Sequence, residues 1–284
     1  MIRFSRKEPF NSSFFRLVLS LGVADVAMLT VTYFLVRFPR WQLWPVELMC
    51  SNPTGLIARC SLCLPWFLGQ AQFVGVLMLA VNRFTSLVTP LQYNKIWSGS
   101  VLGCCIFGQW GFSAVFVLPM AVQPIGTGPC NENNSAAVVI LQNFQYEKAY
   151  LIFASIFDGL LINAIVAWLY AACIIKLIKR RHQISAAIVT VNTASKQQNN
   201  KVVDRKEVKY AFNGFCIFLA MFLYSLFLGL AATRGNGDNS IAQYVKLWYL
   251  STDVFCEINP YLLLMSSKAL RKHCWATLTC KKIH

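Results

Sequence analysis

The sequence predicts an all-α fold, a bundle of helices that cross a lipid bilayer several times within a single domain covering residues 1–284. Hydrophobic residues make up 56% of the chain and charged residues only 13%, about half the charged share of a soluble globular domain. The apolar residues are gathered in long runs, and most of the charges lie between these runs. This composition indicates lipid-facing surface.

Six apolar runs are long enough to cross a bilayer. A hydrocarbon core about 30 Å thick needs roughly 20 helical residues, each rising about 1.5 Å. We therefore predict six spans followed by a cytoplasmic tail. The spans cover about residues 14–36, 60–82, 99–122, 148–175, 208–232 and 245–267, and the tail covers residues 268–284.

The distribution of Lys and Arg predicts the orientation. These residues are concentrated before the first span, between the second and third, between the fourth and fifth, and after the sixth. Because cytoplasmic loops carry an excess of Lys and Arg, these segments and both chain ends are expected in the cytoplasm. The loop Gln123–Glu147 is then extracellular, and the sequon at Asn133 predicts glycosylation there. The net charge of +15 does not indicate nucleic-acid binding, because no basic, aromatic-interleaved domain is present.

Four carboxylic acids lie inside the predicted spans: Asp25, Asp158, Asp253 and Glu257. An ionised acid at the bilayer centre costs at least about 2.5–3.5 kcal/mol, so such residues normally face the bundle interior and have a partner. Each acid has two open interpretations, an ion or ligand site, or a hydrogen-bonded acid that only holds helices together. Asp253 and Glu257 are four residues apart and share one helical face.

The pair Asn259-Pro260 follows in the same span as Glu257. Proline frees a backbone carbonyl and kinks a helix. The Asn259 side chain is expected either to satisfy that carbonyl or to reach Asp25 across the bundle. The kink predicts a pivot, although many transmembrane helices contain a proline without such a role.

Arg83 ends the second span within the stretch LAVNRFTSLVTPLQYNKIW, residues 79–97. At this position its charge reaches water at the cytoplasmic face. Two roles remain open. Arg83 is either a plain cytoplasmic anchor, or a switch residue that docks on neighbouring helices in one state and on a partner in another.

Together these residues resemble a rhodopsin-type G-protein-coupled receptor whose first helix is absent. The matching pieces are Leu19–Asp25 for the helix-two signature, Asn82-Arg83-Phe84 for the motif that closes helix three, Trp110 and Pro119 for helix four, and Asn259-Pro260-Tyr261 for the helix-seven motif. More narrowly, FNSSFFRL, LAVNRFTSLVTPLQYNKIW and INPYLLLMSSKALR resemble nematode serpentine chemoreceptors of the Srg superfamily, class gamma or class V.

The sequence also departs from the rhodopsin-type pattern. Asn82 replaces the usual acid before Arg83, Leu263 stands where the helix-seven motif has a Tyr, and the span 208–232 lacks the Pro of the family's switch motif. The resemblance places the missing first helix upstream of Met1.

The resemblance implies a chemosensory receptor in the plasma membrane of sensory cilia. It would bind a small chemical in the outer half of the bundle and signal to a heterotrimeric G protein at the cytoplasmic face. The implied ligand-binding residues are Trp66, Phe67, Gln70, Tyr150, Asp158, Tyr224, Phe227, Tyr249 and Asp253. The implied switch residues are Asp25, Arg83, Glu257, Asn259 and Pro260, and the implied G-protein face contains Arg83, Lys179, Arg180, Arg181, Lys206 and Lys209.

The family's disulfide, which ties the long outer loop to the top of helix three, would join Cys130 to Cys60, with Cys63 and Cys50 as rival partners. No metal site or cofactor is predicted, because the pair Cys60 and Cys63 is not matched by His or Cys at zinc spacing.

Three alternatives remain. A transporter or channel would use the intramembrane acids as a relay, but the sequence shows no repeated halves and no matched Gly- or Pro-broken helices. An enzyme is not indicated, because the chain has no HExxH, no Gly-x-Ser-x-Gly and no Gly-rich phosphate loop. Without its first helix, the chain would alternatively be a truncated receptor that does not signal.

Overall fold

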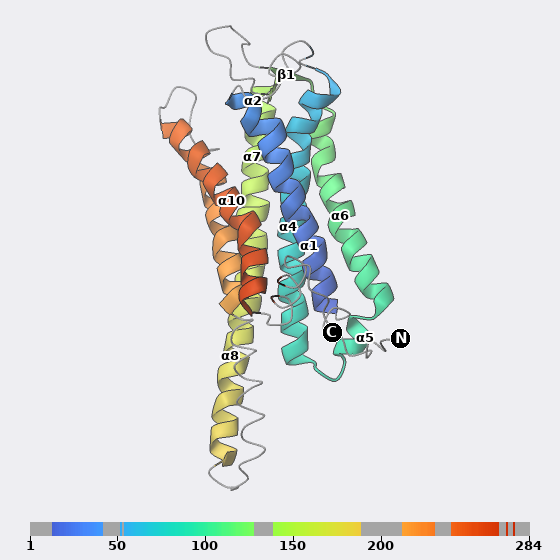
Figure 1. Cartoon of the computed structure of the whole chain (residues 1–284), viewed down its shortest axis with the longest axis vertical. Coiled ribbons are helices and arrows are strands. Elements are labelled where there is room, and N and C mark those ends of the chain that lie inside the picture. The colour runs from blue at the N-terminus through green and yellow to red at the C-terminus, as the bar shows by residue number, and fades with distance from the viewer. Residues whose placement is uncertain are drawn as a thin grey trace.

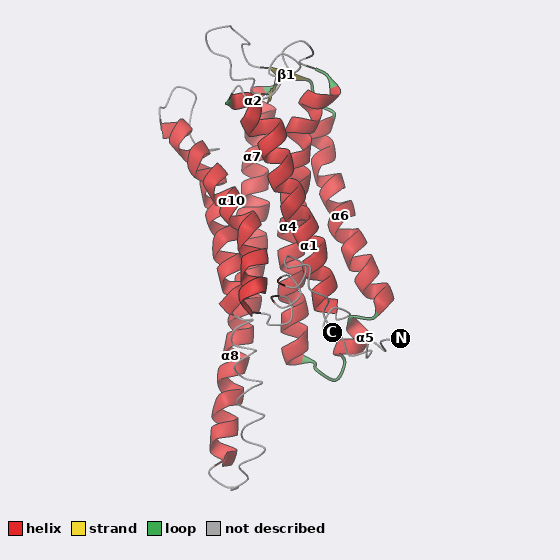
Figure 2. Ribbon diagram, in the orientation of Figure 1, coloured by secondary structure: helices red, strands yellow, loops and turns green. Residues whose placement is uncertain are grey.

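The structure is a computed structural model that describes residues 13–41, 54–127, 139–188, 212–230 and 240–266, together with positions 52, 271 and 275. Almost all of these residues are helical, and the long helices run side by side along one axis (Figures 1 and 2). Helices lie at all six positions predicted from the apolar runs.

The elements follow one another along the chain as long helices with short connections. In order they are α1 (Ser13–Val31), the π-helix η2 (Thr32–Arg37), α2 (Phe38–Arg40), α4 (Leu56–Val88), α5 (Tyr93–Ile96), α6 (Gly99–Ala121), β1 (Ile125–Thr127), β2 (Val139–Leu141), α7 (Phe144–Ala154), the π-helix η3 (Ser155–Ile162), α8 (Asn163–Ile188), the helix Phe212–Leu230, and α10 (Ser240–Ser266).

Helix α4 lies at the centre of the bundle (Figure 1) and packs against α1, α6 and α8. The buried face of α1 carries Leu17, Leu21 and Met28, which follow the spacing of an amphipathic helix. The bundle centre contains Phe73 of α4, whose ring centroid lies 5.5 Å from Tyr224 and 5.8 Å from Phe255. This aromatic core joins α4 to the helix Phe212–Leu230 and to α10.

The two ends of the bundle differ in structure. At one end, which we call the hairpin end, β1 and β2 pair antiparallel with Ile125 opposite Leu141. This hairpin was not predicted. At the opposite end, which we call the Arg83 end, α4 ends at Val88 and Pro90 follows two residues later. The chain therefore passes between the two ends with each long helix.

Large apolar side chains cover the outside of the bundle. Val26, Phe107, Leu160 and Trp168 each expose more than half of their surface. Apolar exposure on this scale is unusual for a soluble monomer and matches contact with lipid.

Among the described residues, five helices are long and apolar enough to cross a membrane: Ser13–Arg37, Leu56–Val88, Gly99–Ala121, Gln145–Lys179 and Phe212–Leu230. Helix α10 is long enough, with 27 residues, but it carries Asp253, Glu257 and Asn259, which lower its hydropathy.

Two π-helical segments interrupt the long helices. η2 extends α1 as far as Arg37, and η3 lies between α7 and α8 around Asp158. A π-segment adds a residue to a helical turn and re-aims the side chains near it, and such segments are frequent at functional sites. Both segments carry a buried charged residue, Arg37 in one and Asp158 in the other.

Candidate functional site

Asp25 lies in a hydrogen-bonded contact among three helices, which we call the Asp25 cluster. Gln72 Nε2 of α4 donates to Asp25 Oδ1 at 2.8 Å, and Asn259 Nδ2 of α10 donates to Asp25 Oδ2 at 3.3 Å. Gln72 Nε2 also lies 3.1 Å from Cys256 Sγ. Of the two roles expected for Asn259, the structure shows the reach to Asp25. Both carboxyl oxygens of Asp25 therefore have a partner.

A second acid is paired with an arginine. Arg37 of η2 donates to both carboxyl oxygens of Asp253, at 2.7 and 2.8 Å, and to the Tyr249 main-chain oxygen at 2.8 Å. Its guanidinium carbon lies 4.5 Å from the centroid of the Tyr33 ring and 5.2 Å from that of Tyr249. Arg37 is only 7% exposed, so this two-bond ion pair connects η2 to α10 in a largely dry setting.

The third acid is arranged differently, in a group that we call the Asp158 cluster. Asp158 of η3, Asn163 at the start of α8, and Gln70 of α4 are all at most 5% exposed. Asn163 Nδ2 donates to the Asp158 main-chain oxygen at 2.9 Å and to Ser225 Oγ at 3.1 Å. The Gln70 amide lies beside the Asp158 carboxyl.

Three polar atoms of the Asp158 cluster have no hydrogen-bond partner: Asp158 Oδ1, Gln70 Nε2 and Asn163 Oδ1. Trp248 Nε1 of α10 is likewise buried without a partner. Buried polar atoms are usually hydrogen-bonded, because an unsatisfied one costs about 1–3 kcal/mol. Together these atoms offer both donors and acceptors to a molecule that enters the cluster.

Tyr224 packs beside the Asp158 cluster. Its ring centroid lies 5.9 Å from that of Trp248 and 6.0 Å from that of Phe255. A Cβ atom at Gly69 of α4 would lie 3.5 Å from the Tyr224 hydroxyl, so α4 passes directly by this group. The predicted ligand residues Gln70, Asp158 and Tyr224 are therefore brought together.

The other predicted ligand residues lie elsewhere. Trp66 and Tyr150 contact each other edge to face, with centroids 5.4 Å apart, and Tyr150 Oη donates to the Phe116 main-chain oxygen at 3.2 Å. Phe67 turns away from them and packs on Trp110, with centroids 5.7 Å apart.

Phe227 is half-buried in the helix Phe212–Leu230. Tyr249 and Asp253 belong to the Arg37 contact described above. The nine predicted ligand residues therefore do not form one pocket.

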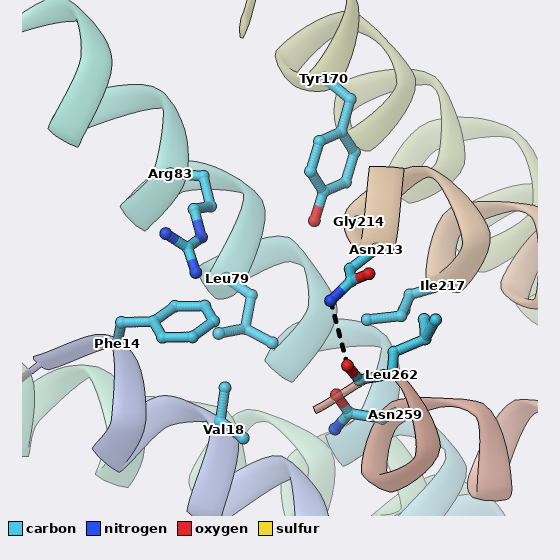
Figure 3. A pocket seen from close by; sticks show the side chains of 10 residues that line it. All are labelled: Phe14, Val18, Leu79, Arg83, Tyr170, Asn213, Gly214, Ile217, Asn259 and Leu262. Atoms are coloured by element: carbon cyan, nitrogen blue, oxygen red, sulfur yellow. Dashed lines mark hydrogen bonds between the residues drawn. The ribbon is translucent and has the colours of Figure 1, made fainter. Parts of the chain in front are cut away.

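Arg83 borders a small cavity at its end of the bundle (Figure 3). The cavity has a volume of about 30 Å³, and Phe14, Tyr170, Asn213 and Asn259 contribute to its lining. The Arg83 guanidinium carbon stacks 3.6 Å from the centroid of the Phe14 ring. Arg83 is therefore docked on a neighbouring helix, as the switch interpretation expects for one of its two states.

The chain after Arg83 folds back onto α4. Tyr93 Oη donates to Asn82 Oδ1 at 3.2 Å, and Trp97 Nε1 donates to Thr85 Oγ1 at 2.8 Å. Ser13 Oγ of α1 lies 2.7 Å from Tyr93 Oη. The stretch that resembles the serpentine receptors thus forms one unit, which fastens the α4–α6 connection to α4 and α1.

These features can be compared with known proteins. Residues 1–280 match the serpentine-type seven-transmembrane G-protein-coupled chemoreceptor family Srv. The chain belongs to the Srv family. It is also 25% identical over 272 residues to Serpentine receptor class V-1 of Caenorhabditis elegans, an alignment that covers 94% of this chain and 79% of that receptor. The match is to class V, the second of the two classes suggested by the sequence.

Membership of the Srv family makes the chain a multi-pass membrane protein of the chemosensory G-protein-coupled receptor type. The family is one of receptors, not of enzymes. Membership of this family also favours the receptor interpretation over a transporter or a channel.

Two predicted switch residues of this Srv receptor do not face the bundle interior. The side chains of Glu257 and Pro260 are exposed on α10. Glu257 was expected to share the interior with Asp253, but one helical turn rotates it by about 40°. Because α10 lies at the edge of the bundle, this rotation is enough to bring Glu257 to the surface (Figure 1).

The disulfide expected in the Srv receptor is not formed with Cys60. Cys60 and its rival Cys63 are free thiols, both half-buried in α4. Cys130 and the sequon residue Asn133 lie outside the described residues, and so does the rival Cys50.

The cations predicted for the G-protein face are only partly described. Lys179 is exposed on α8, where Arg180 and Arg181 continue the same helix. Lys206 and Lys209 lie outside the described residues.

Sequence reasoning missed Gln72, Arg37 and Asn163. Gln72 lies in an apolar run, where a single amide does not change the hydrophobic periodicity. Arg37 was counted only as a charge that flanks the first span. A polar residue within a span normally has a polar partner. If this rule had been applied to Gln72 and Asn163 as well as to the acids, both residues would have been predicted to face a polar partner inside the bundle.

Proposed function

We propose that this Srv receptor binds a small molecule at the Asp158 cluster and activates a heterotrimeric G protein at the Arg83 end. The observation that carries the proposal is the set of buried polar atoms without partners on Asp158, Gln70 and Asn163. A ligand that supplies these hydrogen bonds binds favourably because it removes an existing penalty. Tyr224 and Trp248 add the aromatic wall that small-ligand sites generally contain.

A physical connection links the proposed ligand site to the Arg83 end. Asn259 donates to Asp25 in the bundle interior and also lines the cavity beside Arg83. Gln72 holds the other oxygen of Asp25 and lies two residues after Gln70 on α4. A ligand that rotates α4 at Gln70 therefore acts on the Asp25 cluster, and through Asn259 on the Arg83 cavity. Ligand binding would shift the equilibrium between two arrangements of these helices.

We further propose that the Arg83 end faces the cytoplasm and that α10 is a sixth membrane span. The excess of Lys and Arg on that side supports the orientation. The six long helices would then correspond to helices two to seven of the receptor fold, because α1 carries the LSLGVAD stretch and α10 carries Asn259-Pro260-Tyr261. On this correspondence the family's first helix has no counterpart among the described helices.

The coupling proposal is tested by nucleotide exchange. The full chain is reconstituted in lipid vesicles with a heterotrimeric G protein, and GTP analogue uptake is measured with a broad panel of odorants. Arg83→Ala is expected to reduce the best response about tenfold. Lys148→Ala, which removes an exposed cation of α7 near the hairpin end, is the matched control and should respond normally. Equal responses from wild type and Arg83→Ala would exclude Arg83 from the coupling.

The orientation and location are tested with epitope tags in worm sensory neurons. Antibody applied to intact cells should reach a tag inserted in Gln123–Glu147 and should not reach one inserted in Lys176–Lys209. Microscopy of the same cells should place the receptor in the plasma membrane of the sensory cilia. Labelling of the second tag without permeabilisation would invert the receptor and remove the proposed cytoplasmic coupling face.

A further inference from the structure

A groove opens from the lipid-facing surface between η3 and the helix Phe212–Leu230. Its volume is about 310 Å³, at the lower end of the roughly 300–1,000 Å³ found for small-molecule sites. Its floor is formed by small residues, with Ser155 and Gly159 on one side and Ser225 and Gly229 on the other. We call it the η3 groove.

The rim of the η3 groove is aliphatic and continuous with the surface that contacts lipid. Ile156 is 54% exposed, Leu160 67% and Leu226 42%. None of the described residues that line the groove carries a charge. The groove therefore suits an uncharged molecule that arrives from the bilayer, because an ionised group would lose its hydration without gaining a counter-charge.

The polar floor of the groove offers acceptors and not donors. Ser155 Oγ donates its hydrogen to the Leu151 main-chain oxygen at 2.7 Å, and Ser225 Oγ donates to that of Met221 at 3.0 Å. Each hydroxyl is thereby left with lone pairs only. Asn163 is buried and does not line the groove, but its amide donates to Ser225. A bound molecule must therefore bring a donor.

We propose that the η3 groove binds an uncharged straight-chain alcohol, with its hydroxyl at Ser225 and its alkyl chain along Leu160 and Leu226. The inference rests on the proposed receptor function and adds to it the class of ligand and the side from which it arrives. Asn163 also bonds the main chain of Asp158, so the alcohol head lies next to the Asp158 cluster.

A second hollow on the same lipid-facing side serves as a comparison. The aromatic cleft between α6 and α7, with a volume of about 510 Å³, is lined by Phe112, Phe116, Phe153 and Phe157 among others. Its buried hydroxyl, on Tyr150, already donates to the Phe116 main-chain oxygen. Unlike the η3 groove, the cleft has no floor of serines and glycines between its aromatic walls, and it should not select an alcohol.

The test uses the full chain in lipid nanodiscs, without G protein, and a diazirine-bearing octanol as the photoreactive probe. Mass spectrometry is expected to find saturable labelling on residues 152–160 and 222–230. Excess 1-octanol should suppress this labelling, and octylamine should not. Labelling that rises linearly with probe and spreads over all lipid-facing helices would show bulk lipid contact only and overturn the proposal, as would equal competition by octylamine.

Variants make the test specific. Gly229→Leu places a side chain where even a Cβ atom would lie 3.9 Å from Ser155, and it should reduce saturable labelling about tenfold. Gly22→Leu is the matched control, because a Cβ at Gly22 meets nothing within 4 Å, and it should label normally. Ser225→Ala, which keeps the groove open but removes an acceptor, should weaken labelling several-fold. Normal labelling of Ser225→Ala would exclude the proposed hydroxyl position.

The binding and coupling experiments fail independently. Saturable octanol labelling together with absent nucleotide exchange would overturn the proposed G-protein coupling and leave the groove site standing. Exchange in response to other odorants, with only non-saturable octanol labelling, would overturn the groove site and leave the receptor function standing.

Discussion

The two faces of α4 each place a glutamine beside a buried acid, yet the two contacts differ. Gln72 faces α1 and donates to Asp25, whose second oxygen is held by Asn259. Gln70, rotated by about 200° around the helix, faces η3 and lies beside Asp158, and both side chains there have a polar atom without a partner. In the Asp25 contact both carboxyl oxygens are bonded and only Gln72 Oε1 lacks a partner, whereas the acid and the two amides of the Asp158 cluster each have a polar atom available for a ligand.

The glycines show a related difference between the α1 and α6 side of α4 and the contact of η3 with the helix Phe212–Leu230. A Cβ at Gly75, on the α1 and α6 side, would lie 2.8 Å from Gln109 Nε2 and 3.1 Å from Leu21 Cδ1. On the other side, a Cβ at Gly159 would lie 3.4 Å from Ser225 and one at Gly229 would lie 3.9 Å from Ser155. A side chain at Gly75 would therefore clash, whereas one at Gly159 or Gly229 would make only ordinary contacts.

The largest expected difference is between two alanine variants of the acids. Asp25→Ala removes the acceptor of both Gln72 and Asn259, and each buried donor left unpaired costs about 1–3 kcal/mol, so we expect a loss of about 3 kcal/mol in unfolding free energy. Asp158→Ala removes an acid with one carboxyl oxygen already unpaired, and should cost less than about 1 kcal/mol. Denaturation in mixed detergent micelles measures both. Equal losses would contradict the distinction between the two faces.

The glycines give a difference of intermediate size. Gly75→Ala forces the fixed Gln109 amide to move, and overpacking of this kind costs about 1–3 kcal/mol. Gly229→Ala meets only ordinary contacts, and the gain in helix propensity, about 0.8–1 kcal/mol, should make it neutral or stabilising. The same denaturation experiment compares them. A larger loss for Gly229→Ala than for Gly75→Ala would show that the η3 side is the tighter one.

The smallest expected difference is between two serines. Ser20 Oγ donates to Gln109 Oε1 at 3.0 Å and accepts from Trp110 Nε1 at 3.1 Å, so Ser20→Ala breaks two contacts between helices and should cost about 1 kcal/mol. Ser155→Ala breaks only a bond within its own helix, and should cost no more than about 0.5 kcal/mol. Thermal unfolding monitored by tryptophan fluorescence resolves the pair. Indistinguishable midpoints would remove Ser20 from the contact between α1 and α6.

The positions of the helices followed from hydrophobicity alone, because a run of about 20 apolar residues has few alternatives to a membrane helix. The contact between Asn259 and Asp25 was also within reach, since polar groups inside a bilayer seek one another. The ion pair of Arg37 with Asp253 was not predicted. It depends on the π-helical turn of η2, and neither η2 nor η3 changes the hydrophobic periodicity of the sequence in a way that could be recognised.

The grouping of the candidate ligand residues followed from the sequence only in part, for a related reason. Gln70, Asp158 and Tyr224 lie in one region, because depth along a helix follows from residue number. Phe67 was assigned to the same region but faces Trp110, because depth does not fix the direction around the helix. The hydrogen bond from Asn163 to Ser225 could not be predicted without knowing which helices are neighbours.

The fastening of Tyr93 and Trp97 has a mechanical consequence. Since these side chains hydrogen-bond the α4–α6 connection to Asn82 and Thr85, the connection and the last turns of α4 move as one rigid unit. Any rotation of α4 that separates the Arg83 guanidinium from the Phe14 ring must therefore also move the exposed Leu91, which lies in this unit. A partner protein that contacts only Leu91 would thus respond to a rotation that begins several turns further along α4.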